Sequence, residues 1–146
     1  MSREIVDQLD EQFASLINDL KELVRAVPPD LLYRRNPPAV SIGENLLRSA
    51  AAIEQTCGGL TANLWDDPFE WTLPETLSDA DRIIEYLSEV DAARQRAFSA
   101  IADNNALSKY ISVPSGEPRV LIDLLHETLA KAGDYRKAVL QDYPVY

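Results

Sequence analysis

The sequence is poor in the residues that most often build covalent links and transition-metal sites, because it has one cysteine and one histidine among 146 residues. Cys57 cannot form a disulfide within the chain. With His126 as the single imidazole, a Cys/His zinc cluster cannot be assembled within one chain either. We interpret Cys57 as a small buried side chain in a helix, in preference to a reactive thiol.

Positive charge is also scarce, because 14 Lys and Arg residues stand against 24 Asp and Glu residues, for a formal net charge of −10. Such a field repels phosphate backbones and anionic membranes, so we expect neither a nucleic acid nor a membrane as a partner. No apolar run approaches the ~20 residues of a membrane span. The segment Met1–Asp7 is charged rather than a signal-peptide core. These features predict a soluble cytoplasmic protein.

Several catalytic patterns are missing as well. The sequence contains no glycine-rich phosphate loop, no nucleophile elbow and no second histidine for a His-based metal cluster. Carboxylate pairs such as Asp66 with Asp67 are common in an acidic chain, and we interpret them as solvated faces and helix starts. No motif therefore indicates a reaction class.

What the sequence does contain is helical periodicity. Hydrophobic residues make up 46% of the chain, and their three-and-four spacing predicts amphipathic helices. We place these helices at about 5–27, 41–64, 78–104 and 118–141. Ser41 and Glu44 form a capping box at the second start, and Pro118 suits the first position of the last helix. Tyr110–Val113 alternates but is short and isolated, so no strand is expected.

The connection between the second and third helices is long. The segment Trp65–Pro74 has two prolines, no helical period and both tryptophans, so we interpret it as a crossover. We expect one domain, 1–146, folded as an all-α four-helix bundle whose second and third helices run parallel. The crossover residues Trp65, Phe69 and Trp71 are interpreted as anchors on the bundle, with a lid over a ligand as the alternative.

Two segments carry a resemblance to a known family. Ser41–Arg48 opens the second helix and Leu121–Arg136 frames the fourth, with the Leu31–Pro38 lead-in and the Ser115–Glu117 turn in the same order. In these features the chain resembles the DinB/YfiT-like superfamily of bacterial four-helix-bundle proteins over most of its length. The resemblance implies a DinB-like bundle in a bacterial protein that forms a homodimer.

Members of that superfamily commonly bind a divalent metal through three histidines. The matching positions are Arg48 on the second helix and Lys131 and Tyr135 on the fourth, followed by Arg136. Arginine has no lone pair to donate and lysine is ordinarily protonated. The positions that hold the metal in the superfamily therefore lack suitable ligands in this chain, and we predict no bound metal and no cofactor.

Two alternatives remain for the residues at this centre. In the first, Arg48 pairs with Glu44 and Lys131 pairs with Glu127, because each glutamate lies four residues earlier on the same helix face. The centre then holds solvated polar side chains that pair with one another and bind no ligand.

The second alternative is a pocket for a small anionic ligand, a carboxylate or a phosphate. Its candidate ligand-binding residues are Arg48, Lys131, Asp134 and Tyr135. His126 and Tyr135 are the candidates for acid–base catalysis, although a lone helical histidine is more often structural.

The combined prediction is a DinB-like protein of unassigned molecular function, acting as a metal-free module that binds a small ligand or a partner. The alternative is a metal-independent enzyme resembling a transferase or isomerase, which acts on an anionic or thiol-conjugated small molecule. That enzyme needs Arg48 and Lys131 to line one accessible cavity.

Overall fold

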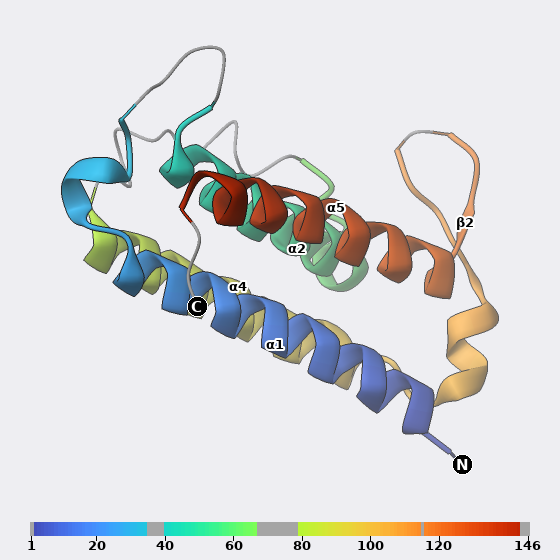
Figure 1. The fold of residues 1–146 in the computed structure, drawn as a ribbon. Helices are drawn as coiled ribbons and strands as arrows, with labels where there is room; N and C mark the ends of the chain where they lie inside the picture. Colours follow the sequence, from blue (N-terminus) through green and yellow to red (C-terminus); the bar gives the residue numbers. More distant parts are fainter. Residues whose placement is uncertain (1, 35–39, 67–78, 115, 144–146) are drawn as a thin grey trace.

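The computed structural model describes residues 2–34, 40–66, 79–114 and 116–143, which are mostly helical (Figure 1). The long helices are α1 (Glu4–Ala26), α2 (Ile42–Ala62), α4 (Ala80–Ser99) and α5 (Leu121–Asp142). The shorter elements are the 3-10 helices Pro29–Leu31 and Asn104–Ser108 and the strands β1 (Tyr110–Ile111) and β2 (Arg119–Val120). The prediction of four long helices is confirmed for these ranges. None of the described helices has the length and hydropathy to cross a membrane.

Local sequence signals set two of the helix starts. Ser41 Oγ accepts a hydrogen bond from the Glu44 N–H at 3.2 Å, which is the predicted N-cap of α2. Asp79 Oδ1 accepts from the Arg82 N–H at 2.9 Å and caps α4 in the same way. α1 ends just before Pro28, because a proline disfavours helical backbone in the residue that precedes it.

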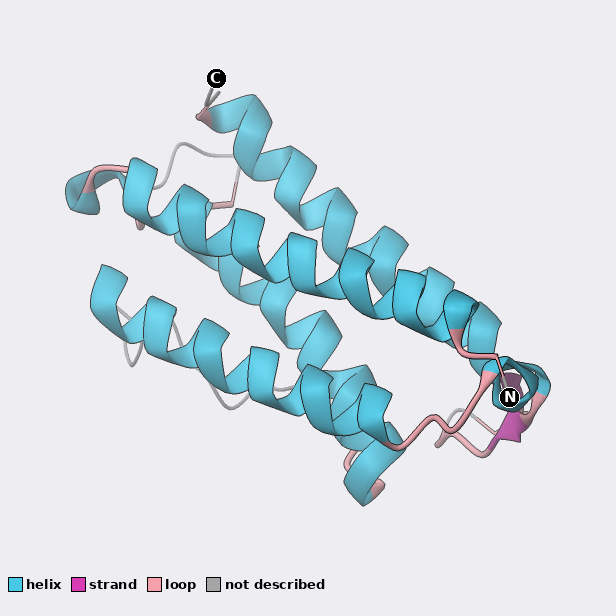
Figure 2. Ribbon diagram, turned by 90° about the horizontal axis from the view of Figure 1, so that it is seen from below, coloured by secondary structure: helices cyan, strands magenta, loops and turns pink. Residues whose placement is uncertain are grey.

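The prediction that no strand forms is wrong. β1 and β2 pair antiparallel, with Tyr110 opposite Val120 and Ile111 opposite Arg119. Gly116, at φ 112°, adopts a backbone conformation in the intervening turn that favours glycine. Figure 2 shows the strand pair at the same end of the bundle as the amino terminus.

Two helix bounds also differ from the prediction. α5 starts at Leu121 rather than Pro118, because β2 is extended and runs directly into the helix. The Leu121 N–H donates to the Lys109 carbonyl at 2.9 Å and extends the contact between the two strands. α4 ends at Ser99 rather than near Asn104, where a separate 3-10 helix begins.

The helices form two pairs with the core between them. In Figure 1, α2 and α5 lie above α1 and α4. α2 lies against both α4 and α5, whereas α1 lies mainly against α4. The largest fully buried side chains include Phe13, Ile17, Leu20, Leu46, Leu47, Ile53, Leu87, Phe98 and Leu125. The ring centroids of Phe13 and Phe98 are 5.3 Å apart in a tilted arrangement, which joins α1 to α4.

A charge cluster strengthens the contact between α1 and α4. Arg94 of α4 is buried, and its Nε donates to Asp91 at 2.8 Å while its Nη1 donates to Asp10 of α1. Burial alone would lower the pKa of Arg94, but the hydrogen bonds to Asp91 and Asp10 raise it above its ordinary value. Arg94 therefore stays charged and holds the two helices together.

Small and hydroxyl side chains join α2 to α5. Ser49 Oγ donates to the Ala132 carbonyl at 2.7 Å, and the Thr56 and Thr128 hydroxyl oxygens lie 2.6 Å apart. All four residues are buried. Because the distance between packed helices depends on the side chains at their contact, these small residues let α2 and α5 approach closely. We call these four residues the α2/α5 seam.

Candidate functional site

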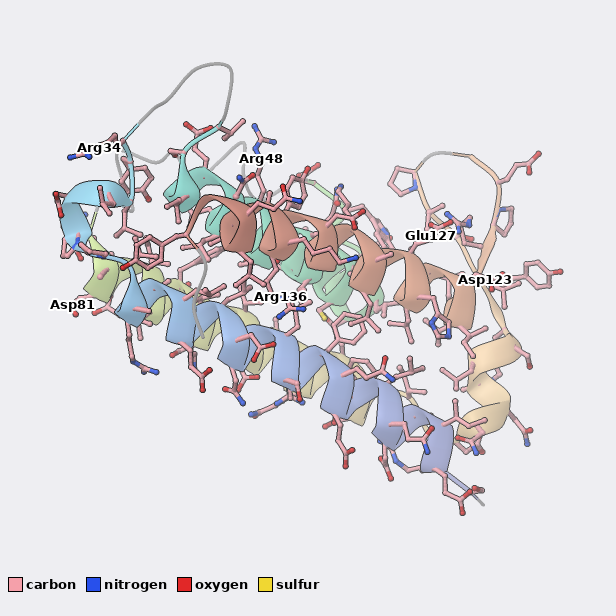
Figure 3. The ribbon with its side chains drawn as sticks, in the orientation of Figure 1. Arg34, Arg48, Asp81, Asp123, Glu127 and Arg136 are labelled. Atoms are coloured by element: carbon pink, nitrogen blue, oxygen red, sulfur yellow. The ribbon has the colours of Figure 1, made fainter. Side chains whose placement is uncertain are left out.

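The predicted site residues lie on the paired helices α2 and α5. They are Arg48 on α2 and His126, Lys131, Asp134 and Tyr135 on α5. The hydrogen bond from Ser49 to Ala132 brings the neighbouring positions into the same stretch of the two helices. Arg48 and Tyr135 are partly buried and the other three are exposed, and Figure 3 shows Arg48 projecting on the side away from α1. An anion pocket around these residues stays a prediction.

The expected pairing of Glu127 with Lys131 is wrong. Glu127 Oε1 lies 2.5 Å from Arg119 Nη2 instead, because β2 runs directly into α5 and carries Arg119 alongside the helix. The hydrogen bond from Arg119 lowers the pKa of the Glu127 carboxyl and raises the pKa of the Arg119 guanidinium. Both side chains reach solvent, so we expect this ion pair to add little to stability.

Cys57 and the described carboxylates offer no metal centre. Within the described ranges, no three His, Cys, Asp or Glu side chains lie close enough together to hold a metal ion. Cys57 is fully buried, and burial raises the pKa of its thiol to about 12. A thiol with this pKa stays protonated and unreactive at neutral pH. The interpretation of Cys57 as a buried structural residue is confirmed.

Trp65 is an anchor on α2, as interpreted from the sequence. A Cβ added at Gly59 would come within 2.3 Å of the Trp65 ring, so the glycine is what allows the indole to lie against the helix. Trp65 Nε1 also donates to Asn63 Oδ1 at 2.9 Å. Trp65 borders two hollows of about 430 and 270 Å³, so its contact with a ligand stays a prediction. Phe69 and Trp71 lie outside the described residues.

A groove of about 490 Å³ lies between α1 and α5. It forms because α1 lies mainly against α4 and α5 lies against α2, so α1 and α5 touch only sparsely. α1 lines it with Gln8, Glu11, Gln12, Ser15, Leu16 and Asp19, and α5 lines it with Leu129, Gly133 and Arg136. We call it the α1/α5 groove.

Arg136 spans this groove near one end. Figure 3 shows its side chain directed from α5 toward α1, and its Nη1 donates to Asp19 Oδ2 at 3.2 Å. The two side chains are 32% and 45% exposed, so water screens the ion pair. Arg136 Nε, by contrast, is buried and has no hydrogen-bond partner in the part of the chain that the structure describes. A buried donor without an acceptor lowers the stability of the fold by about 1–3 kcal/mol. A ligand that supplies an acceptor to Arg136 Nε would remove this penalty.

Gly133 leaves the middle of the groove unfilled. A Cβ at this position would meet nothing within 4 Å, so no steric constraint requires glycine here. Glycine inside a helix is about 0.8–1 kcal/mol less favourable than alanine. Leu16 is buried and Leu129 partly buried beside it. The groove thus combines open space, the two apolar side chains Leu16 and Leu129, and a mostly polar rim.

Most residues of the groove were not predicted from the sequence. Arg136 stood out only as the residue after the three metal-ligand positions, and Gly133 had no assigned role. One signal was available, because polar residues recur at three- and four-residue spacing on α1, at Gln8, Gln12, Ser15 and Asp19. The same pattern is typical of any solvated helix face, so it does not distinguish a groove from an ordinary surface.

Comparison of the chain with known proteins gives distant sequence matches. No protein-family model matches the chain, and no solved structure matches it. The chain is 26% identical over 121 residues to the chloroplastic 1,8-cineole synthases of Picea glauca, Picea sitchensis and the hybrid of Picea engelmannii and Picea glauca. Each match covers 79% of this chain and 19% of the synthase, so the chain spans about a fifth of the length of these curated relatives. Matches of this identity and extent assign the chain to no family.

Proposed function

We propose that this protein is a metal-free small-ligand-binding module of the DinB-like kind, and that its ligand lies in the α1/α5 groove. The observation that carries this proposal is the groove itself, with the buried Arg136 Nε lacking an acceptor among the described residues. Its volume of about 490 Å³ is in the range of ~300–1,000 Å³ that small-molecule sites have. Binding requires no metal, because a guanidinium N–H and an apolar base are sufficient to orient an organic molecule.

The DinB-like part of the proposal includes parallel α2 and α4. Two observations support this direction. Tyr86, early in α4, donates to Glu54 Oε2 of α2 at 2.5 Å. In Figure 1, both helices run toward the end of the bundle that carries the strand pair. These observations favour parallel α2 and α4, which is the arrangement that a long crossover between them allows.

A second candidate site is the pocket predicted around Arg48, Lys131 and Tyr135. The bond between Ser49 and Ala132 supports it, because that bond brings the adjacent segments of α2 and α5 together. Formation of a homodimer, a cytoplasmic location and the metal-independent enzyme stay predictions.

The test is a small-molecule screen that follows the backbone amide signals of the labelled protein by NMR. We expect the compounds that bind to shift the signals of Gln12, Ser15 and Gly133. Gly133→Leu directs a side chain into open space in the groove, and we expect it to weaken these compounds at least about tenfold, which is ~1.4 kcal/mol.

Ala130→Leu is the matched control, because Ala130 is exposed on the same helix and does not line the groove. It should leave binding unchanged. The proposal is wrong if every compound that binds shifts signals around Arg48 and Lys131 instead, or if Gly133→Leu and Ala130→Leu behave alike.

A further inference from the structure

The charges along the α1/α5 groove specify a class of ligand. This inference rests on the proposed function, and it adds the chemistry of the molecule that binds. We infer that the groove takes an elongated organic cation that carries an amide, with its carbonyl oxygen at Arg136 Nε and its ammonium group at Glu11. Amidated short peptides and diamines acylated on one nitrogen belong to this class.

The Arg136 end of the groove favours a neutral acceptor over an anion. The positive charge of Arg136 already faces Asp19, whose Oδ2 is 3.2 Å from Nη1. What Nε lacks within the described chain is one hydrogen-bond acceptor. A ligand carboxylate placed there would also approach the Asp19 carboxylate, and like charges at short range repel. An amide carbonyl supplies the acceptor without that repulsion.

The other end of the groove favours a cation. Glu11 is exposed and forms no ion pair with the described residues. Its neighbours in the groove, Gln8 and Gln12, are neutral. The groove therefore holds two carboxylates and one guanidinium, in a protein whose formal net charge is −10. That field attracts cations and repels anions over a distance of several ångströms.

The length of the ligand follows from the helix. Glu11 and Asp19 are eight residues apart on α1, which is about 12 Å at 1.5 Å per residue. An extended chain of three amino acids spans about 10–11 Å. Leu16 and Leu129 line the space between the two ends, and Gly133 leaves room for a central side chain. A tripeptide with an apolar middle residue matches these dimensions.

Three probes that share one tripeptide backbone test the effect of the charges at the ligand's ends. They are the tripeptide Gly-Leu-Gly as its amide, which is a cation, as the free acid, which is a zwitterion, and as the N-acetylated acid, which is an anion. Binding is measured by NMR titration of the full-length protein at low salt. We expect the amide to bind most tightly, the free acid about two- to five-fold more weakly and the acetylated acid weaker again.

Two variants assign the ends of the probe. Glu11→Gln should reduce the preference for the amide over the acetylated acid about two- to five-fold. Glu22→Gln removes the same charge from an exposed position on α1 outside the groove and should preserve that preference. Arg136→Lys keeps a positive charge opposite Asp19 but removes Nε, so it should weaken all three probes by a similar factor of about ten.

Failure of this inference is distinct from failure of the proposed function. If the acetylated acid binds as tightly as the amide, or if none of the three probes shifts the groove signals, the inference is wrong. Other screen compounds that bind the groove would still support the proposed function in that case. If no compound binds the groove at all, both proposals are wrong.

Discussion

Helix α5 meets α2 along the seam and meets α1 across the groove, and the two contacts differ in almost every respect. In the seam, Thr128 and Ala132 are buried and their polar atoms are hydrogen-bonded to α2. In the groove, Gly133 borders open space and Arg136 has a buried donor without a described partner. Ala132 and Gly133 are adjacent in the chain and differ by one methyl group. Small residues thus close one side of α5 and leave the other side open.

This difference separates stability from binding within a single helix. A closely packed contact with its polar atoms paired contributes to folding, whereas an open contact with an unpaired donor contributes less. Sites that bind ligands are drawn from the less stable parts of proteins. We therefore expect substitutions in the seam to change the free energy of unfolding, and substitutions in the groove to change mainly ligand binding.

The largest effect is expected for Ala132→Leu. Ala132 is fully buried against α2, so three additional carbon atoms must displace their neighbours or separate the helices. Overpacking of this kind destabilises a core by about 1–3 kcal/mol. Urea unfolding followed by circular dichroism measures this loss. If Ala132→Leu leaves the unfolding midpoint unchanged, the seam is not closely packed and the comparison with the groove fails.

The next effect is expected from the two threonines of the seam. Thr128 Oγ1 donates to the Leu124 carbonyl at 2.9 Å, and since a hydroxyl has one proton, Thr56 is the donor in the pair with Thr128. Thr128→Val removes the acceptor and leaves the Thr56 hydroxyl buried without it. We expect a loss of about 1–2 kcal/mol from an unsatisfied buried group of this kind.

Thr56→Val is the control for this pair. It leaves Thr128 bonded to Leu124, so it should cost less than Thr128→Val. The double variant should resemble Thr56→Val, because replacing both partners leaves no unsatisfied donor. Equal losses in both single variants, with a double variant equal to their sum, would show that the two hydroxyls do not interact.

The sequence predicted the helices well because their signals are local. Apolar spacing depends on residues within one turn of each other, and the caps at Ser41 and Asp79 lie next to the helices that they start. The strand pair was missed because each strand has two residues. Segments this short become extended only when they pair with each other. The pairing of Tyr110 with Val120 depends on the turn between the strands, and neither strand alone predicts it.

The groove could not be predicted because it is a property of distances between helices. The sequence shows that Asp19 and Arg136 are charged, but not that they face each other. Their meeting depends on how α1 is held against α4 by Phe13, Phe98 and Arg94. The position of α1 also determines how sparsely it touches α5. Residue types were therefore evident from the sequence, while the open space between them was not.

The smallest effect, and the one of opposite sign, is expected for Gly133→Ala. The new Cβ meets nothing within 4 Å, and alanine is about 0.8–1 kcal/mol more favourable than glycine inside a helix. We therefore expect a gain of that size, measured as a higher urea midpoint with the same slope. Gly59→Ala makes the same change in α2, where the Cβ would lie 2.3 Å from the Trp65 ring, so it should destabilise. If both variants lose stability, α5 is constrained at Gly133 by contacts that close the groove. If Gly133→Ala gains stability and Gly59→Ala loses it, the space beside Gly133 is open, and glycine at this position lowers the stability of α5 without a steric need for it.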